Sequence, residues 1–187
     1  MRNMLIGFFI LIFISFIAAL IIIFLSSKKP FVKIEEQVLE NAIIEDAKKR
    51  FQGADIVDIV KITKRDENEV VLVRLTYNYS SICPKRHHVY YSYPSGRFLP
   101  EYPVEVITNC DFCRNGSCFI AYEEEAIIAS VNIKGSEKIR DFVISQKAYP
   151  VVKKLDKNYL QVSWISNDKK AVVVISQNGE LISSKID

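Results

Sequence analysis

Cysteine is the residue type whose pattern in this sequence most clearly indicates chemistry. The four cysteines, Cys83, Cys110, Cys113 and Cys118, lie in two neighbouring segments of the 187-residue chain. In an oxidising compartment, an even number of clustered cysteines predicts disulfides, and four cysteines allow three pairings. The sequence does not choose among these pairings. A bond from Cys83 to the later cluster would close a loop of about 30 residues and stabilise the fold by roughly 3–4 kcal/mol.

Zinc binding and redox exchange are the alternatives that the same cysteines leave open. Cys110 and Cys113 have the C-x-x-C spacing of a zinc knuckle. The other ligands of a tetrahedral site would come from Cys83, Cys118, His87 or His88. However, no second knuckle begins at Cys83, and no Lys or Arg shortly precedes Cys110 to favour the thiolate that redox exchange needs. We therefore expect two disulfides and no cofactor, with zinc as the alternative.

Histidines and tyrosines offer binding surface more readily than catalysis. His87 and His88 are adjacent, so on a strand they would point to opposite faces and could not easily bind one metal together. We expect both on the surface or in a loop. Six of the nine tyrosines lie between Tyr77 and Tyr102, where aromatic rings with polar tips suit recognition, although tyrosine also favours strands. The candidate binding residues are Tyr77, Tyr79, Tyr90, Tyr91 and Tyr93.

The charged residues show no catalytic signature. A net charge of +3 argues against a strongly basic nucleic-acid binder. Glu123, Glu124 and Glu125 are interpreted as acids at a helix N-terminus, which the helix dipole favours, and not as a cation site. The sequence contains no phosphate loop, dinucleotide fingerprint, G-x-S-x-G motif or paired-carboxylate motif. We therefore expect a protein that is not an enzyme and does not bind nucleic acid.

The segment that sets the compartment is Leu5 to Leu25. It contains no charged side chain and is long enough, as a helix, to span about 30 Å of bilayer hydrocarbon. It is longer than the apolar core of a cleaved secretory signal, so we interpret it as a membrane anchor in contact with lipid. The positive charges that follow it mildly favour a cytoplasmic domain. The cysteines, and the short leader before the anchor, favour a domain outside the cytoplasm, which we expect.

The remaining chain predicts an α+β fold with two similar halves. A helical pattern from Phe31 to a stop at Gly53 precedes strands at residues 56–64, 70–79 and 88–93. Arg74, Thr76 and Asn78 share the face of the second strand that we expect to be solvated. A second helical region opens at the three glutamates, breaks at Gly135 and resumes with Ser136 as its cap. Further strands follow at residues 148–155, 159–165 and 171–176, then an Asn-Gly turn and a short strand, with Trp164 in the core.

These elements divide the chain into four expected parts. They are an anchor with a short link (residues 1–29), a first helix-plus-sheet unit (30–99), a cysteine-containing connector (100–120) and a second helix-plus-sheet unit (121–187). Similar strand–turn phrases occur at residues 89–98 and 172–181, which suggests a divergent duplication. A helix laid on an antiparallel sheet is a stable two-layer arrangement for each unit.

The second unit resembles a known family. Its helix and strands, followed by Asn178, Gly179, Glu180, Leu181 and Ile182, are similar to PepSY-like domains. The first unit matches only in element order, and the cysteine-containing connector departs from the family pattern. The resemblance implies a small extracytoplasmic module with a helix on a curved antiparallel sheet, and a non-catalytic binding or inhibitory role. It implies no catalytic residues.

The sequence as a whole predicts a single-pass, membrane-anchored binding module outside the cytoplasm. Its partner would be another envelope protein or a peptide, which the exposed sheet edges of such a fold could pair with. The alternative is a zinc-stabilised adaptor domain attached to the cytoplasmic side of the membrane.

Overall fold

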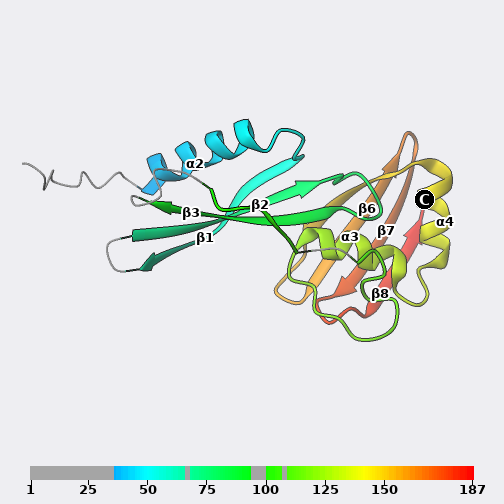
Figure 1. Cartoon of the computed structure of the whole chain (residues 1–187). Helices are drawn as coiled ribbons and strands as arrows, with labels where there is room; N and C mark the ends of the chain where they lie inside the picture. Colours follow the sequence, from blue (N-terminus) through cyan, green and yellow to red (C-terminus); the bar gives the residue numbers. More distant parts are fainter. Residues whose placement is uncertain (1–35, 66–67, 94–99, 107–108) are drawn as a thin grey trace, which may run out of the picture. The chain divides into compact units, whose positions relative to one another are not determined.

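A computed structural model describes residues 36–65, 68–93, 100–106 and 109–187 (Figure 1). The fold is α+β, with two four-stranded antiparallel sheets and three helices among these residues, which confirms the α+β part of the predicted fold class. The expected anchor, Leu5 to Leu25, lies outside the described residues. Within the described ranges, no helix is both long and apolar enough to cross a bilayer.

The first sheet has the strand order β1-β2-β3-β4 and carries helix α2 on one face (Figure 1). The elements are α2 (Glu36–Arg50), β1 (Ile56–Arg65), β2 (Asn68–Tyr77), β3 (Lys85–Tyr93) and the two-residue β4 (Val104–Glu105). Strand β2 alternates as predicted, so that Val71, Val73 and Leu75 are all fully buried. They share a face with Tyr91 of β3, whose hydroxyl donates to Asp46 of α2 at 3.1 Å.

The second sheet has the order β5-β6-β7-β8 and packs against helices α3 and α4. The helices are α3 (Glu123–Asn132) and α4 (Glu137–Gln146), and the strands are β5 (Tyr149–Lys154), β6 (Tyr159–Ser166), β7 (Lys169–Ser176) and β8 (Leu181–Ile186). Trp164 is fully buried in this core, as predicted, and its indole N–H donates to the Ser130 hydroxyl at 3.0 Å. The hydrogen bond satisfies the one polar atom that such a large buried side chain carries.

The junction between α3 and α4 differs from the prediction in one respect. The helix breaks at Gly135 as expected, but Ser136 does not cap α4 with its side chain. Its hydroxyl donates instead to the carbonyl of Ile133 at 2.6 Å. The carboxylate of Glu137 turns back to accept from the Gly135 N–H at 3.1 Å. The preceding helix end therefore competes successfully for the serine hydroxyl.

Two glycines with positive φ differ in what surrounds them, so substituting each by alanine separates backbone strain from steric contact. Gly53 and Gly179 both have positive φ, +97° and +78°, but only at Gly179 would an added Cβ clash, with the sulfur of Cys118. Gly53→Ala should destabilise the fold by about 1–2 kcal/mol because of backbone strain alone. Gly179→Ala should lower the thermal unfolding midpoint clearly further. Equal losses would show that Cys118 does not pack against the β7–β8 turn.

Candidate functional site

Strands β1, β2 and β3 place five polar side chains together on the face of the first sheet opposite α2. Arg74 pairs across the strands with Asp58 and His88, and Thr76 pairs with Arg86. Side chains of directly paired residues project from the same face of a sheet. The alternation that buries Val73 and Leu75 beneath α2 therefore gathers two arginines on the other face.

The N-terminus of α3 covers these arginines. Glu124 is fully buried; it accepts the hydroxyl of Thr76 and, at 3.4 Å, one guanidinium nitrogen of Arg74. Arg74 also donates twice to the carboxylate of Asp58, at 2.9 and 2.6 Å. A buried carboxylate is tolerated only when it is paired and hydrogen-bonded, and both conditions are met here.

Glu125 holds the second arginine and caps its own helix. One carboxylate oxygen accepts from Arg86 at 2.9 Å, and the other accepts the backbone N–H groups of Ala121 and Tyr122 at 2.6 and 3.1 Å. The guanidinium of Arg86 lies 3.8 Å from the centre of the Tyr122 ring, a cation–π contact. We call Asp58, Arg74, Thr76, Arg86, Tyr122, Glu124 and Glu125 the buried ionic cluster.

Three buried polar atoms at this cluster lack a hydrogen-bond partner among the described residues. They are Nε and Nη1 of Arg86 and Nε2 of His88. Burial lowers the pKa of His88, and the nearby positive charge of Arg86 lowers it further. Burial also raises the pKa of Tyr79 to about 12, helped by the charge of Glu123, to which its hydroxyl donates at 3.2 Å. The neutral forms of both side chains are thus favoured.

The location of these residues corrects two predictions. Arg74 and Thr76 were expected on a solvated face, but Arg74 is 9% exposed and Thr76 is fully buried. His88 lies in β3, within the strand predicted for residues 88–93, but it was expected on the surface and its Nε2 is instead buried. In both cases α3, distant in sequence, covers the face. The only signal for this contact was the run of three glutamates, which was interpreted as a local helix feature.

The cysteines form two disulfides, Cys83–Cys110 and Cys113–Cys118, which confirms the expected use of all four. The C-x-x-C residues Cys110 and Cys113 therefore belong to different bonds. This pairing leaves no thiolate at these four positions for the zinc or redox alternatives. The first bond ties the loop after β2 to the connector, and the second closes a short loop within the connector.

The candidate tyrosines do not share one surface. Tyr91 is fully buried beneath α2, so its assignment to a binding surface is wrong. Tyr90 is 38% exposed on the other face of β3, opposite Leu72. Tyr77, Tyr79 and Tyr93 are half-buried, and Tyr79 contacts Glu123 of α3. The alternation of β3 separates the tyrosines between the two faces of the first sheet.

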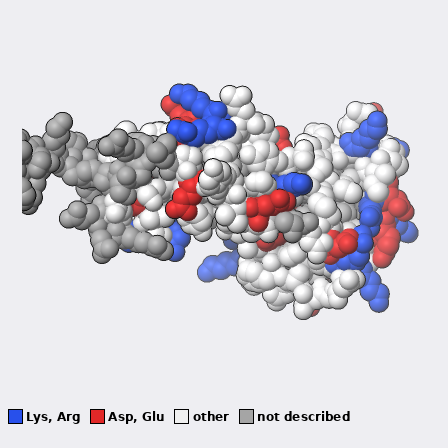
Figure 2. Space-filling view, in the orientation of Figure 1, with Lys and Arg blue, Asp and Glu red and all other residues white. Residues whose placement is uncertain are grey.

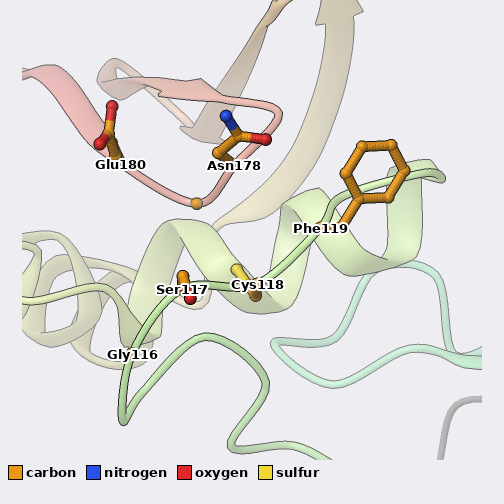
Figure 3. A pocket seen from close by; sticks show the side chains of 7 residues that line it. Gly116, Ser117, Cys118, Phe119, Asn178 and Glu180 are labelled. Atoms are coloured by element: carbon orange, nitrogen blue, oxygen red, sulfur yellow. The ribbon is translucent and has the colours of Figure 1, made fainter.

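Two surface hollows lie beside the cysteine-containing connector and the start of α3. One, of about 750 Å³, lies between the loop at Ser117 and Cys118 and the turn that carries Asn178 and Glu180 (Figure 3). The other, of about 240 Å³, has Arg74 in its lining together with Tyr122 and Lys154. The guanidinium of Arg74 is already bound to Asp58 and Glu124, so it offers little to a ligand.

The chemistry of the cluster is that of a structural lock. Its carboxylates are bound to arginines, and the described residues bring together no group of three side chains suited to a metal. On the visible face of the molecule, acidic and basic side chains are interspersed without a large patch of one sign (Figure 2).

Strand edges are the clearest feature of the described residues that could bind another chain. Strand β1 ends the first sheet but has a register shift at Ile59 and Lys61, and β3 is partly covered by residues 100–106. Strand β5 carries Pro150 and two lysines. Bulges, prolines and lysines all discourage strand addition. Strand β8 also carries one lysine, Lys185, and a register shift against β7 at Val174 and Ile175. That shift lies at the start of β8, the strand contains no proline, and residues 182–186 are all exposed, so β8 is the least protected of these edges.

No family model, no curated protein and no solved structure matches this chain.

Neutralising Glu124 should strongly destabilise the fold. Glu124→Gln keeps the side-chain volume but removes the fully buried charge that Arg74 and Arg86 share, so that Arg74 keeps only Asp58 and Arg86 keeps only Glu125. This should cost about 3 kcal/mol of unfolding free energy in urea titration. The matched control is Glu123→Gln, one residue earlier and only half-buried. It should cost less than about 1 kcal/mol. Similar losses for both variants would contradict a buried lock at Glu124.

Acid should weaken the fold through His88. Its pKa in the folded chain is below the ordinary value of 6.5, so the unfolded chain takes up the proton first as pH falls. The stability contributed by neutral His88 is therefore present above about pH 6.5 and is lost below it. His88→Gln should flatten the dependence of unfolding free energy on pH in this range. His87→Gln should leave the His88 contribution unchanged, and an equal effect of both variants would count against it.

Proposed function

We propose that this protein is a membrane-tethered, non-catalytic binding module whose disulfide-braced domain lies outside the cytoplasm and engages another protein or a peptide. The anchor would be Leu5 to Leu25, in contact with the lipid bilayer. The observation that carries the binding role is the exposed edge of β8, since such an edge presents backbone donors and acceptors that an extended segment can pair with.

The compartment is supported by the two disulfides. Disulfides persist in oxidising compartments and are rare in the cytosol, where thiols are kept reduced. Cys83–Cys110 and Cys113–Cys118 include every cysteine of the chain. The alternative, a zinc-stabilised adaptor on the cytoplasmic side, would require free thiolates at these positions.

A duplicated architecture also fits this role. Each sheet is four-stranded and antiparallel, and each half of the chain begins with a helical region. We interpret the halves as two similar helix-on-sheet units, the second of which resembles PepSY-like domains. In this proposal the buried ionic cluster and the disulfides serve rigidity, and the edge of β8 serves recognition.

Photo-crosslinking in cells that make the protein tests the binding role. A benzoylphenylalanine placed at Ile182 of β8, which is 52% exposed, should give a discrete adduct when illuminated. The matched control is Val60, an exposed apolar residue on β1, an edge strand with a bulge and lysines. It should give no adduct, because the register shift of β1 lies in the middle of the strand and interrupts the edge, whereas that of β8 lies at its start. Identical adducts at both positions, or none at Ile182, would contradict the proposal.

The compartment is tested separately by thiol chemistry on the protein from its native membrane. Alkylation without reductant should modify none of the four cysteines, and alkylation after reduction should modify all four. Four thiols that react without reduction would place the domain in a reducing compartment and overturn the proposed location.

A further inference from the structure

The backbone of β8 presents its free hydrogen-bonding groups at defined residues. Lys170 and Asp187 exchange two backbone hydrogen bonds, so the backbone N–H and C=O groups of Asp187 point toward β7. Backbone groups alternate in direction along an antiparallel strand. The N–H and C=O groups of Lys185 and Ser183 therefore also point toward β7, where these residues pair with Val172 and Val174. The N–H and C=O groups of Ser184 and Ile186 therefore point away from the sheet.

The side chains of this strand are complementary to those of the same strand turned around. In an antiparallel arrangement centred on Ser184, Ser183 lies opposite Lys185 of the second copy. Ile182, which the register shift leaves without a partner on β7, lies opposite Ile186 of the second copy. Ile182 and Ile186 are 52% and 43% exposed, so the pairing would cover apolar surface at both ends.

The neighbouring registers of the same two strands bring unfavourable side chains opposite each other. A shift by two residues in one direction places Lys185 directly opposite Lys185 of the second copy, and like charges in that position are destabilising. The same shift in the other direction places Ile186 opposite Glu180. Pairing centred on Ser184 avoids both contacts and aligns the outward backbone groups of the two strands.

We propose that the partner seated on β8 is a second copy of this chain, joined edge to edge around a two-fold axis at Ser184. The inference rests on the proposed function, because it names the partner of the same edge. The pairing would join two four-stranded sheets into one continuous sheet. An isologous contact of this kind closes on itself, so that it ends at a dimer and does not form fibres. Attachment to one membrane would raise the effective concentration of a small interface.

Cysteine crosslinking of the full chain in lipid nanodiscs tests the register. Residues that exchange hydrogen bonds across antiparallel strands have Cα atoms about 5.5 Å apart, within the range that a disulfide spans. Ser184→Cys should therefore give a disulfide-linked dimer under mild oxidation. Ser183→Cys is the matched control, one residue away and equally exposed. The Cα atoms of its two copies would be offset by two residues and more than about 7 Å apart, too far for a disulfide.

A second variant tests the interface without new thiols. Ser184→Pro removes an N–H that points away from β7, so the fold should persist while the dimer is lost. Light scattering should give the mass of a dimer for the wild type and of a monomer for Ser184→Pro, with the native cysteines still protected in both. A monomeric wild type, or equal crosslinking at Ser183 and Ser184, would overturn the second-copy proposal. A photo-adduct of β8 with a different protein would also overturn it, while the binding role would stand.

Discussion

The buried contact between Glu124 and two arginines is the constraint on which the described fold depends. Glu124 is fully buried, and its charge is balanced by Arg74 and Arg86 of the first sheet. Breaking such a contact on one side leaves an uncompensated buried charge, which is far more costly than losing a surface ion pair. Because the ionic geometry is specific, it also fixes the register in which α3 meets strands β2 and β3.

Much of the fold was predictable from local pattern, whereas this contact was not. The alternation in β2 correctly separated Val71, Val73 and Leu75 from Arg74 and Thr76. Alternation identifies two faces of a strand but does not reveal what covers the second one. The covering element, α3, is nearly 50 residues away in the chain, at sequence separations of 48 and 50 for its bonds to Thr76 and Arg74. For the same reason, His88 and Tyr91 were expected to be more exposed than they are.

The disulfides show a similar division between composition and geometry. The number and clustering of the cysteines were enough to predict two bonds, and the three-dimensional arrangement then selected Cys83–Cys110 and Cys113–Cys118. The Cys113–Cys118 disulfide also restricts which residue can occupy position 179. Gly179 has φ +78° and lies against the sulfur of Cys118, so that both its backbone conformation and its lack of a side chain are required. Covalent and steric constraints thus hold the connector against the β7–β8 turn that leads into β8.

The contacts that hold the connector and the β7–β8 turn also hold the backbone of β8. An edge strand recognises a partner well only if its backbone is held in a fixed, extended conformation before contact, because ordering it on binding would consume affinity. Strand β8 is held along one side by β7, at its start by the disulfide-braced turn and at its end by the paired Lys170 and Asp187. Its other side carries neither a proline nor a covering strand among the described residues. Strand β8 therefore combines a preorganised backbone with an open edge.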